Sequence, residues 1–482
     1  MSYTRKTIGG LLAMAAFSMT LIPQSAKAQT VDYRSDAQRR VPTYSIAYQV
    51  PTEKSIIEVL QAVKGYYERS AERTIINSKT GEVLTDTAVY CPDAVVNKGF
   101  AAEWSYTHGV VLSAFDYIDN ILGDKSYFAN NVAFYDFVSK WQPYFAKHHM
   151  TGWRPITNMS ALDHCGSIGA AMVKTYLKTK NKAYLPLIER VDQHVSHDQC
   201  RLSDGTLSRH RPQWESVWAD DMYMSVPFLI NMYVMTGKKA YADDAVRQIL
   251  QMAQRLYVPQ MGIFDHGWNA NSADYDPHFY WGRANGWVLM SMAEVLDRLP
   301  KNYKGRDEIL RLYRTMVQKL ANLQGGNGFW HNLLDKSDTF EETSCTAMFT
   351  YAIAKGINEG WISHVYGPVA VTGWNATRSA VRADGAVDWT AEGTTFAHDN
   401  SYYYHRGHTV YATHGYGVVL YAGAEMIRLL RNTEIEIVAP KDGAVNSTIH
   451  FLKRSEWPDR ESVEDVRSLG GSVDSKPNPA NR

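Results

Sequence analysis

The sequence repeats a short motif at a fixed spacing, and this repeat constrains the fold more than any other feature. The segments "GDKSY", "KNKAY" and "GKKAY" end at Tyr127, Tyr184 and Tyr241, which are 57 residues apart in both intervals. A period of this length indicates a structural unit that recurs along the chain. Each motif follows an apolar segment rich in small residues and precedes an amphipathic segment with its charges on one face. The repeat therefore predicts pairs of helices, one inner and one outer.

Apolar segments of the inner type recur six times along the chain. They cover residues 109–122, 165–178, 222–235, 286–299, 346–357 and 415–430. Six buried helices that alternate with outer ones predict an all-α fold, an (α/α)6 barrel with six inner and six outer helices. The chain has 482 residues, of which 45% are hydrophobic, so it is long and apolar enough to bury so large a core.

The segments just before the inner helices hold most of the side chains that could do chemistry. In a ring of inner helices that run in the same direction, their N-terminal ends meet on one side. The segments there read "WSYTH", "ALDH", "VWADD", "WGRAN", "FEETS" and "YATH". Loops held by a rigid scaffold are frequent places for binding and catalysis. We therefore expect a functional site at this end of the barrel.

Two adjacent aspartates, Asp220 and Asp221, precede the third inner helix. Proline is tolerated in the first turn of a helix and disfavoured deeper inside, so Pro227 places both aspartates in the entry turn or else kinks the helix. Consecutive helical side chains diverge by about 100°, which predicts that only one carboxylate faces the cavity. Both could simply cap the helix. Asp163, however, stands in the matching place before the second inner helix, and two carboxylates in one cavity raise the proton affinity of one, as general acid catalysis requires.

Aromatic and cationic residues in the same segments fit a sugar ligand. Flat apolar faces beside polar groups suit sugar rings, and the tryptophans here are Trp104, Trp218, Trp281 and Trp287. Arg283 offers a forked donor that can hold a carboxylate through two hydrogen bonds. Taken singly, each tryptophan could be a core residue and Arg283 a structural ion-pair partner.

Other classes of partner have little support in the composition. Lys plus Arg and Asp plus Glu each total 50, with no basic run, so we expect no nucleic-acid partner. After the N-terminal apolar run, no segment has the roughly 18 apolar residues of a membrane span, so no membrane partner is expected. Paired metal-ligand spacings are absent, so we expect no metal and no cofactor. The four cysteines form no CxxC pair, which indicates neither a zinc site nor a disulfide framework; buried thiols are favoured, and a single disulfide stays open.

Four segments together resemble a known family. "ALDHCGSIGAA", "VWADDMYMSVPFL", "FDHGWN" and "YWGRANGWVLMSMAEVL", in this order on a helical repeat, resemble glycoside hydrolase family 105, the unsaturated rhamnogalacturonyl hydrolases. They resemble more distantly the unsaturated glucuronyl hydrolases of family 88. The resemblance covers roughly residues 104–430, and the family has an (α/α)6 fold. Ala284 stands where the family often has glycine.

The resemblance implies an activity and assigns roles. Such an enzyme removes the 4,5-unsaturated uronic acid from the non-reducing end of lyase-generated pectin (rhamnogalacturonan) oligosaccharides by hydrating the double bond. Motif matching makes Asp220 the general acid and base and Asp163 the second carboxylate of the subsite. Substrate binding falls to His210, Trp218, His266, Trp281, Arg283 and Trp287. A shift of one residue in the matching would exchange Asp220 with Asp221, so which of the two faces the cavity stays open.

Two other interpretations compete with this one. A different (α/α)6 glycosidase, acting on saturated or other uronate-containing sugars, needs two carboxylates about 5 to 9.5 Å apart. It could recruit Glu103, Asp335 and Glu342. The other alternative is a non-catalytic periplasmic oligosaccharide binder, in which the tryptophans stack on sugars without turnover. Neither interpretation implies an obligate protein partner.

The two ends of the chain differ from the helical region. Arg5 and Lys6 precede an apolar run over residues 8–22 and small residues at 26–28, a pattern typical of a secretory signal. We expect residues 1–28 to be a signal peptide, 29–50 an irregular segment, 51–450 the (α/α)6 catalytic domain, and 451–482 a polar, weakly ordered tail. The protein is then exported, and the periplasm is favoured over full secretion.

Overall fold

The computed structural model describes residues 49–70, 72–272, 278–438 and 448–453. The expected signal peptide lies outside the described residues, as do almost all of the expected irregular N-terminal segment and all of the expected tail beyond residue 453. The boundaries expected for these parts of the chain stay predictions.

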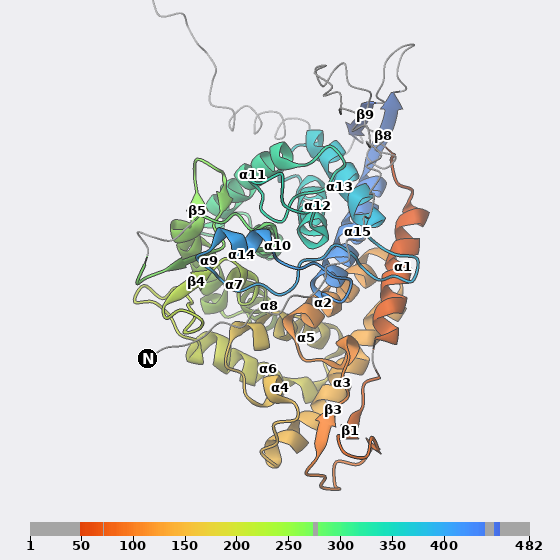
Figure 1. Ribbon diagram of the computed structural model, residues 1–482, viewed down its shortest axis with the longest axis vertical. Helices are drawn as coiled ribbons and strands as arrows, with labels where there is room; N and C mark the ends of the chain where they lie inside the picture. The colour runs from red at the N-terminus through yellow and green to blue at the C-terminus, as the bar shows by residue number, and fades with distance from the viewer. Residues whose placement is uncertain (1–48, 71, 273–277, 439–447, 454–482) are drawn as a thin grey trace, which may run out of the picture. The chain divides into compact units, whose positions relative to one another are not determined.

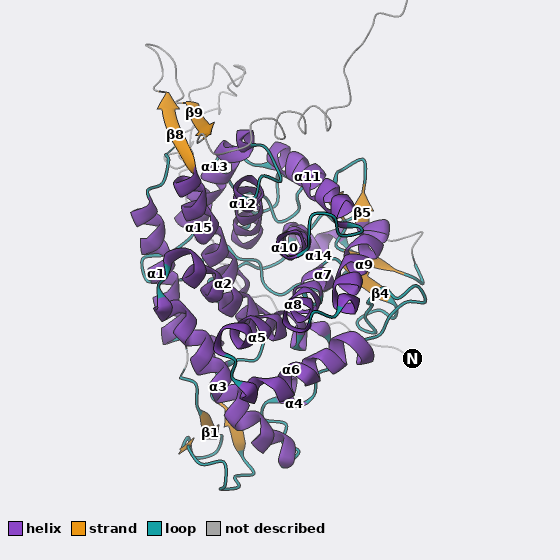
Figure 2. Ribbon diagram, turned by 180° about the vertical axis from the view of Figure 1, so that it is seen from behind, coloured by secondary structure: helices purple, strands orange, loops and turns teal. Residues whose placement is uncertain are grey.

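Six helices form a closed inner ring. They are α2 (Tyr106–Leu122), α5 (Gly166–Thr179), α8 (Val226–Thr236), α10 (Gly282–Arg298), α12 (Thr343–Asn358) and α15 (His414–Asn432). Each packs against the next, and α15 packs against α2, which closes the ring. Figures 1 and 2 show it from opposite sides. Helices apolar on nearly every face must be buried on every face, and the ring achieves this.

Six further helices surround the ring. They are α1 (Glu53–Arg69), α3 (Lys125–Lys147), α6 (Leu185–Asp192), α9 (Lys239–Leu256), α11 (Arg306–Leu323) and α13 (Gly367–Ser379). They pack on α15, α2, α5, α8, α10 and α12 respectively. The (α/α)6 barrel predicted from the repeat is confirmed.

The second and third of the repeated tyrosines link neighbouring outer helices. Tyr184, just before α6, donates a hydrogen bond of 2.7 Å to Asp136 on α3. Tyr241 on α9 donates one of 2.6 Å to Asp192 on α6. The period of 57 residues thus corresponds to a structural contact that recurs from one helix pair to the next.

The inner helices α2 and α5 approach each other closely at a glycine of α2. A Cβ atom on Gly109 of α2 would lie 2.4 Å from the backbone nitrogen of Ile168 on α5. We expect Gly109→Ala to lower the free energy of unfolding by about 1–3 kcal/mol, because the helices must move apart. The control is Gly65→Ala on α1, where a Cβ atom would lie near the far end of the Arg69 side chain and no backbone atom. Alanine favours the helix there, so stability should hold or rise. Urea unfolding curves measure both, and equal midpoints for Gly109→Ala and wild type would contradict the argument.

Short elements complete the described chain. The helices are α4 (Arg154–Thr157), α7 (Asp220–Tyr223) and α14 (Asn400–Tyr404). An antiparallel sheet in the order β2-β1-β3 contains β1 (Ile75–Asn77), β2 (Val83–Leu84) and β3 (Ala94–Val96). Three antiparallel pairs are β4 (Ser216–Trp218) with β7 (Gly267–Asn269), β5 (Tyr257–Val258) with β6 (Ile263–Phe264), and β8 (Thr433–Val438) with β9 (Thr448–Lys453).

All four cysteines are free: Cys91, Cys165 and Cys345 are buried, and Cys200 is partly exposed. Among the described residues, no helix combines the length and apolarity that a membrane crossing requires.

Candidate active site

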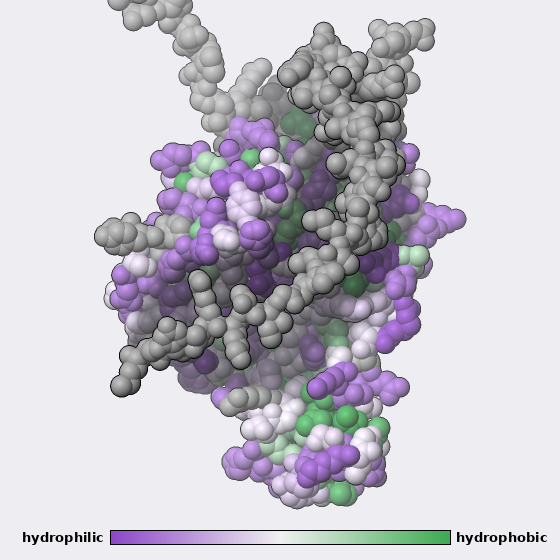
Figure 3. All heavy atoms as spheres, in the orientation of Figure 1, coloured by the Kyte–Doolittle hydropathy of each residue, from purple (hydrophilic) through white to green (hydrophobic). Residues whose placement is uncertain are grey.

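A pocket of about 660 Å³ lies where the segments that precede the inner helices come together. Its wall includes Tyr106 from the start of α2, Asp163 from before α5, Asp220 from before α8, and Thr394 from the segment before α15. The face of the molecule shown in Figure 3 is hollowed toward its centre, with mostly hydrophilic side chains around the hollow. A volume of this size, with several polar groups on the wall, suits a small ligand.

The pairing of two short strands positions Asp220. In the β4–β7 pair, Trp218 lies opposite Gly267, and the N–H of Ala219 donates to the carbonyl oxygen of His266 at 2.9 Å. Asp220 follows as the first residue of the one-turn helix α7. This register brings two segments that are distant in sequence together beside the pocket, and it places Asp220 next to His266.

The two adjacent aspartates point in different directions. The Asp220 side chain is 14% exposed and lines the pocket, whereas the Asp221 side chain is fully buried. The helix breaks at Ser225, and Pro227 sits in the first turn of α8, where its ring is tolerated. The question that the sequence left open is answered by the geometry, because Asp220 faces the cavity.

His266 lies directly behind Asp220. Its Nε2 atom is 3.1 Å from Oδ2 of Asp220, in the geometry of an ion pair rather than of an aligned hydrogen bond. Its Nδ1 atom is 2.6 Å from the hydroxyl oxygen of Tyr403 on α14. The His266 side chain is buried and does not form part of the pocket wall. A carboxylate, an imidazole and a phenol therefore form a chain that leads away from the pocket.

Burial and neighbouring charges shift the pKa of Asp220 in opposite directions. Burial, the largest influence, raises the pKa of Asp220, but His266, and then Arg209 and Arg283, outweigh it and hold this pKa below its ordinary value. The sequence led us to expect a raised proton affinity from a second carboxylate in the cavity. The pKa of Asp220 is lowered instead because His266 and the two arginines outweigh burial, and the second carboxylate, Asp163, is itself paired with Arg209.

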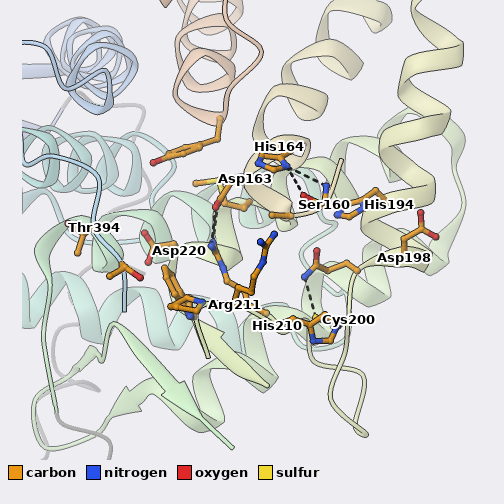
Figure 4. A pocket seen from close by; sticks show the side chains of 18 residues that line it. Ser160, Asp163, His164, His194, Asp198, Cys200, His210, Arg211, Asp220 and Thr394 are labelled. Carbon is orange, nitrogen blue, oxygen red and sulfur yellow. Dashed lines mark hydrogen bonds and ion pairs between the residues drawn. The ribbon is translucent and has the colours of Figure 1, made fainter. Parts of the chain in front are cut away.

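Arg209 joins two carboxylates. Its Nη1 and Nη2 atoms each donate to one oxygen of Asp163 at 3.0 Å, and its Nε and Nη2 atoms donate to Asp221 at 2.8 and 2.6 Å. The guanidinium lies 4.2 Å from the ring centroid of Trp218, a cation–π contact. Burial raises the pKa of Asp221, and the charge of Arg209 opposes this rise. Figure 4 shows the contact to Asp163 as dashed lines.

The other residues expected to bind substrate lie at different depths. His210 and Trp218 line the pocket, and the ring of His210 stacks on Trp214 with 4.0 Å between centroids. Trp281 is buried and donates to Asn332. Trp287 is buried, stacks on Tyr223 and meets the ring of the wall residue Tyr106 edge to face, but it does not itself line the pocket.

The guanidinium of Arg283 is hydrogen-bonded to the backbone of a neighbouring segment. Its two terminal nitrogens donate to the carbonyl oxygens of Ala391 and Glu392 at 2.7 and 2.8 Å, and the residue is 1% exposed. The same segment continues to Thr394 and Thr395 on the pocket wall. In this structure Arg283 therefore holds part of the wall in place. Its predicted role as a ligand of the uronate stays a prediction.

Sequence reasoning did not identify two residues of the site. Tyr106 lines the pocket, and its hydroxyl lies 2.6 Å from Nε2 of His414; the segment "WSYTH" already contained a signal for it. Arg209 had no such signal, because its partners Asp221 and Asp163 lie 12 and 46 residues away in sequence.

Three carboxylates line the pocket, namely Asp163, Asp198 and Asp220. Glu342 instead caps α12, where it accepts hydrogen bonds from the backbone N–H groups of Cys345 and Ala391. The residues that a saturated-sugar glycosidase could recruit, Glu103, Asp335 and Glu342, are absent from the wall. Among the described residues, no group of three or more His, Cys, Asp or Glu could hold a metal ion.

Comparisons with known proteins agree with this architecture. The sequence profile of Glycosyl Hydrolase Family 88 matches residues 66–430. The "Unsaturated 3S-rhamnoglycuronyl hydrolase" of Formosa agariphila is 26% identical over 256 residues, which are 49% of this chain and 67% of that protein. The "Unsaturated rhamnogalacturonyl hydrolase YesR" of Bacillus subtilis is 26% identical over 233 residues, covering 47% and 66%. A solved structure of a possible member of the GH105 family from Salmonella enterica superposes with a TM-score of 0.65, at 22% identity, over 82% of this chain and 97% of that one.

Proposed function

The chain belongs to Glycosyl Hydrolase Family 88, and on this premise we propose that it removes a 4,5-unsaturated uronic acid from the non-reducing end of oligosaccharides made by a polysaccharide lyase. As a member of this family it is a glycoside hydrolase. We propose rhamnogalacturonan fragments of pectin as its substrate. The name of the Bacillus subtilis relative, an unsaturated rhamnogalacturonyl hydrolase, supports this substrate. The Formosa agariphila relative, an unsaturated 3S-rhamnoglycuronyl hydrolase, supports the broader reaction.

The observation that carries the proposal is the position of Asp220, a carboxylate at the pocket wall with His266 directly behind it. In the proposed reaction Asp220 delivers a proton to C4 of the double bond, and the hydroxyl of a water molecule adds to C5 as Asp220 takes the second proton of that water. The product is a hemiketal at C5. Its C5–O5 bond breaks to give a ketone and leaves a hemiacetal at C1, which expels the rest of the oligosaccharide as an alcohol.

The low pKa of Asp220 in the free protein is compatible with its role as an acid when substrate is bound. A like charge nearby disfavours the ionised form of a carboxyl group. The carboxylate of the bound uronic acid brings such a charge into the pocket, so substrate raises the pKa of Asp220. Asp163 adds little to this effect because Arg209 neutralises it. We propose that Asp220 gains its proton on substrate binding and regains it from water at the end of each turnover.

The direct test follows the ultraviolet absorbance of the conjugated uronate double bond during incubation with lyase-generated disaccharides. The proposal expects this absorbance to decay and the neighbouring sugar to be released in equal amount. A constant absorbance, with folded protein and several unsaturated substrates, would refute the proposed reaction and turn attention to a non-catalytic binder.

We expect His266→Gln to move the pH profile of kcat/KM to higher pH. His266 lowers the pKa of Asp220 against the effect of burial, so its removal lets this pKa rise. If protonated Asp220 is the active form, kcat/KM declines as pH passes the pKa of Asp220, and this decline moves to higher pH in the variant. The measurement is kcat/KM against pH for both proteins. A profile of reduced height but unchanged position would mean that His266 only supports the fold.

Export remains part of the proposal. The residues that suggest a signal peptide lie outside the described part of the chain, so the periplasmic location stays a prediction from the sequence.

A further inference from the structure

A second pocket lies at the same end of the barrel as the pocket that Asp220 lines, which is the catalytic pocket. The second pocket has a volume of about 450 Å³, and its wall residues come from two segments, 329–341 before α12 and 379–389 after α13. The carbonyl oxygen of Trp389 accepts a hydrogen bond of 3.0 Å from the N–H of Thr343, the first residue of α12. The two walls have no described residue in common. This space, the Trp389 pocket, is therefore separate from the catalytic pocket.

Trp389 combines a strained backbone with an exposed side chain. Its φ angle is +52°, in the left-handed region that residues other than glycine rarely adopt. The residue is 47% exposed, so burial of the indole recovers only part of the free energy that this conformation costs. The N–H of Trp389 donates to Oδ1 of Asp388 at 2.9 Å, which helps to hold the backbone in place. Strained residues of this kind cluster at sites that bind ligands.

The indole ring of Trp389 is fixed on one side and open elsewhere. The ring of His408 stacks on it, with 4.3 Å between centroids and 20° between planes. Phe340, which lines the same pocket, contacts His408 in turn at 4.9 Å between centroids. Stacking on one face orients the indole, and the exposed part of the ring remains available. A fixed flat aromatic surface can pack against the C–H face of a sugar ring.

Three polar side chains of the Trp389 pocket offer hydrogen-bond acceptors. Oε1 of Glu341 accepts from Asn327 at 2.5 Å, and this carboxylate has no ion pair with a described residue. Nδ1 of His331 donates to the carbonyl oxygen of Thr339 at 2.6 Å, which leaves Nε2 of the neutral ring as an acceptor. The hydroxyl proton of Ser379 is donated to a backbone carbonyl oxygen, so its oxygen can also accept.

This set of groups favours one class of ligand. A neutral sugar presents several hydroxyl donors around a ring with an apolar face. A uronate or a sulfated sugar would bring a second negative charge close to Glu341, and like charges repel. We propose that the Trp389 pocket is a second, non-catalytic carbohydrate site, which binds a neutral sugar ring on the open surface of Trp389. Binding there involves no double bond, so this inference goes beyond the proposed hydrolysis and does not depend on it.

The test measures the binding of two tetrasaccharides by isothermal titration calorimetry. Linear galactotetraose is neutral, tetragalacturonate carries a carboxylate on each sugar, and neither has the unsaturated end that the proposed reaction requires. The variant is Trp389→Gly, because glycine adopts the left-handed conformation without strain and the backbone should keep its course. We expect this variant to bind galactotetraose about tenfold more weakly than wild type, while its affinity for tetragalacturonate stays unchanged.

The matched control is Tyr90→Ala. Tyr90 is 57% exposed and stacks on His148 with 4.7 Å between centroids, as Trp389 stacks on His408, but it lies outside the Trp389 pocket. This control should keep the wild-type affinity for galactotetraose. Glu341→Gln, which leaves the backbone at Trp389 untouched, should weaken the binding of galactotetraose about tenfold through loss of a charged acceptor.

The possible outcomes each decide the proposal. Equal affinity of wild type, Trp389→Gly and Glu341→Gln for galactotetraose overturns the second site, and so does a wild-type protein that does not bind this sugar. A loss of tetragalacturonate binding in Trp389→Gly overturns the choice of a neutral ligand. A dimer in sedimentation velocity that Trp389→Gly dissociates would make a second copy of the chain the occupant instead. Failure of the proposed hydrolysis changes none of these results, because both probes lack the double bond.

Discussion

Replacement of Asp220 by asparagine is expected to reduce kcat on unsaturated disaccharides by about 10³-fold or more, because one group serves as both acid and base. Asparagine has nearly the same shape as aspartate and keeps an oxygen that can face His266. The fold should therefore persist while proton transfer stops. Decay of the ultraviolet absorbance measures the rate, and circular dichroism with urea unfolding checks the fold.

The matched control for this prediction is Asp335→Asn. Asp335 is paired with Lys336 and lies outside the pocket wall, yet a saturated-sugar glycosidase could recruit it. We expect this variant to retain wild-type activity. Nearly full activity in Asp220→Asn would contradict the proposed mechanism, and a loss confined to Asp335→Asn would favour the competing glycosidase.

The architecture was predictable because it is encoded by local patterns that repeat. Each inner segment is apolar on all faces and each outer segment on one face, so the choice between buried and surface helix can be made within a single window of sequence. Closure of the ring followed from the number of such pairs. Gly109 shows the limit of this reasoning, since its close approach to Ile168 depends on how two helices cross.

The site was predictable only where local geometry decided it. The divergence of Asp220 and Asp221 follows from helical geometry and from Pro227. The ion pairs of Arg209 do not, because the segments that hold its partners meet only in the folded ring. For the same reason the sequence did not show that backbone carbonyl groups beyond α13 accept the hydrogen bonds of Arg283.

Arg209 thus determines the electrostatic character of the site. By neutralising Asp163 it removes a like charge that would otherwise raise the pKa of Asp220, and by pairing with Asp221 it compensates a fully buried carboxylate. This cluster of Arg209 and two aspartates is costly to disrupt, because removal of one member of a buried ion pair leaves its partner as an uncompensated buried charge.

We therefore expect Arg209→Met to lower the free energy of unfolding by about 3–5 kcal/mol at neutral pH, the typical cost of orphaning a buried charge. Most of this cost should come from Asp221, which is fully buried, rather than from Asp163, whose side chain is 30% exposed. The double variant Arg209→Met/Asp221→Asn should then recover part of the loss, whereas Arg209→Met/Asp163→Asn should recover less. Urea unfolding measures all four proteins, and a single variant within about 1 kcal/mol of wild type would contradict the assignment, since breaking a buried pair costs more.

The cost of Arg209→Met should also depend on pH with a definite sign. Burial raises the pKa of Asp221 in the folded protein, and loss of Arg209 raises it further, because the charge of Arg209 opposes the rise. A carboxyl group with a raised folded pKa binds its proton more tightly in the folded state, so the fold loses stability as pH rises above the unfolded value of about 3.9. The deficit of Arg209→Met relative to wild type is therefore smallest below about pH 4 and grows toward neutrality. A deficit that shrank as pH rose would mean that the orphaned charge is not a carboxylate, and that Arg209 stabilises the fold mainly through its contact with Trp218.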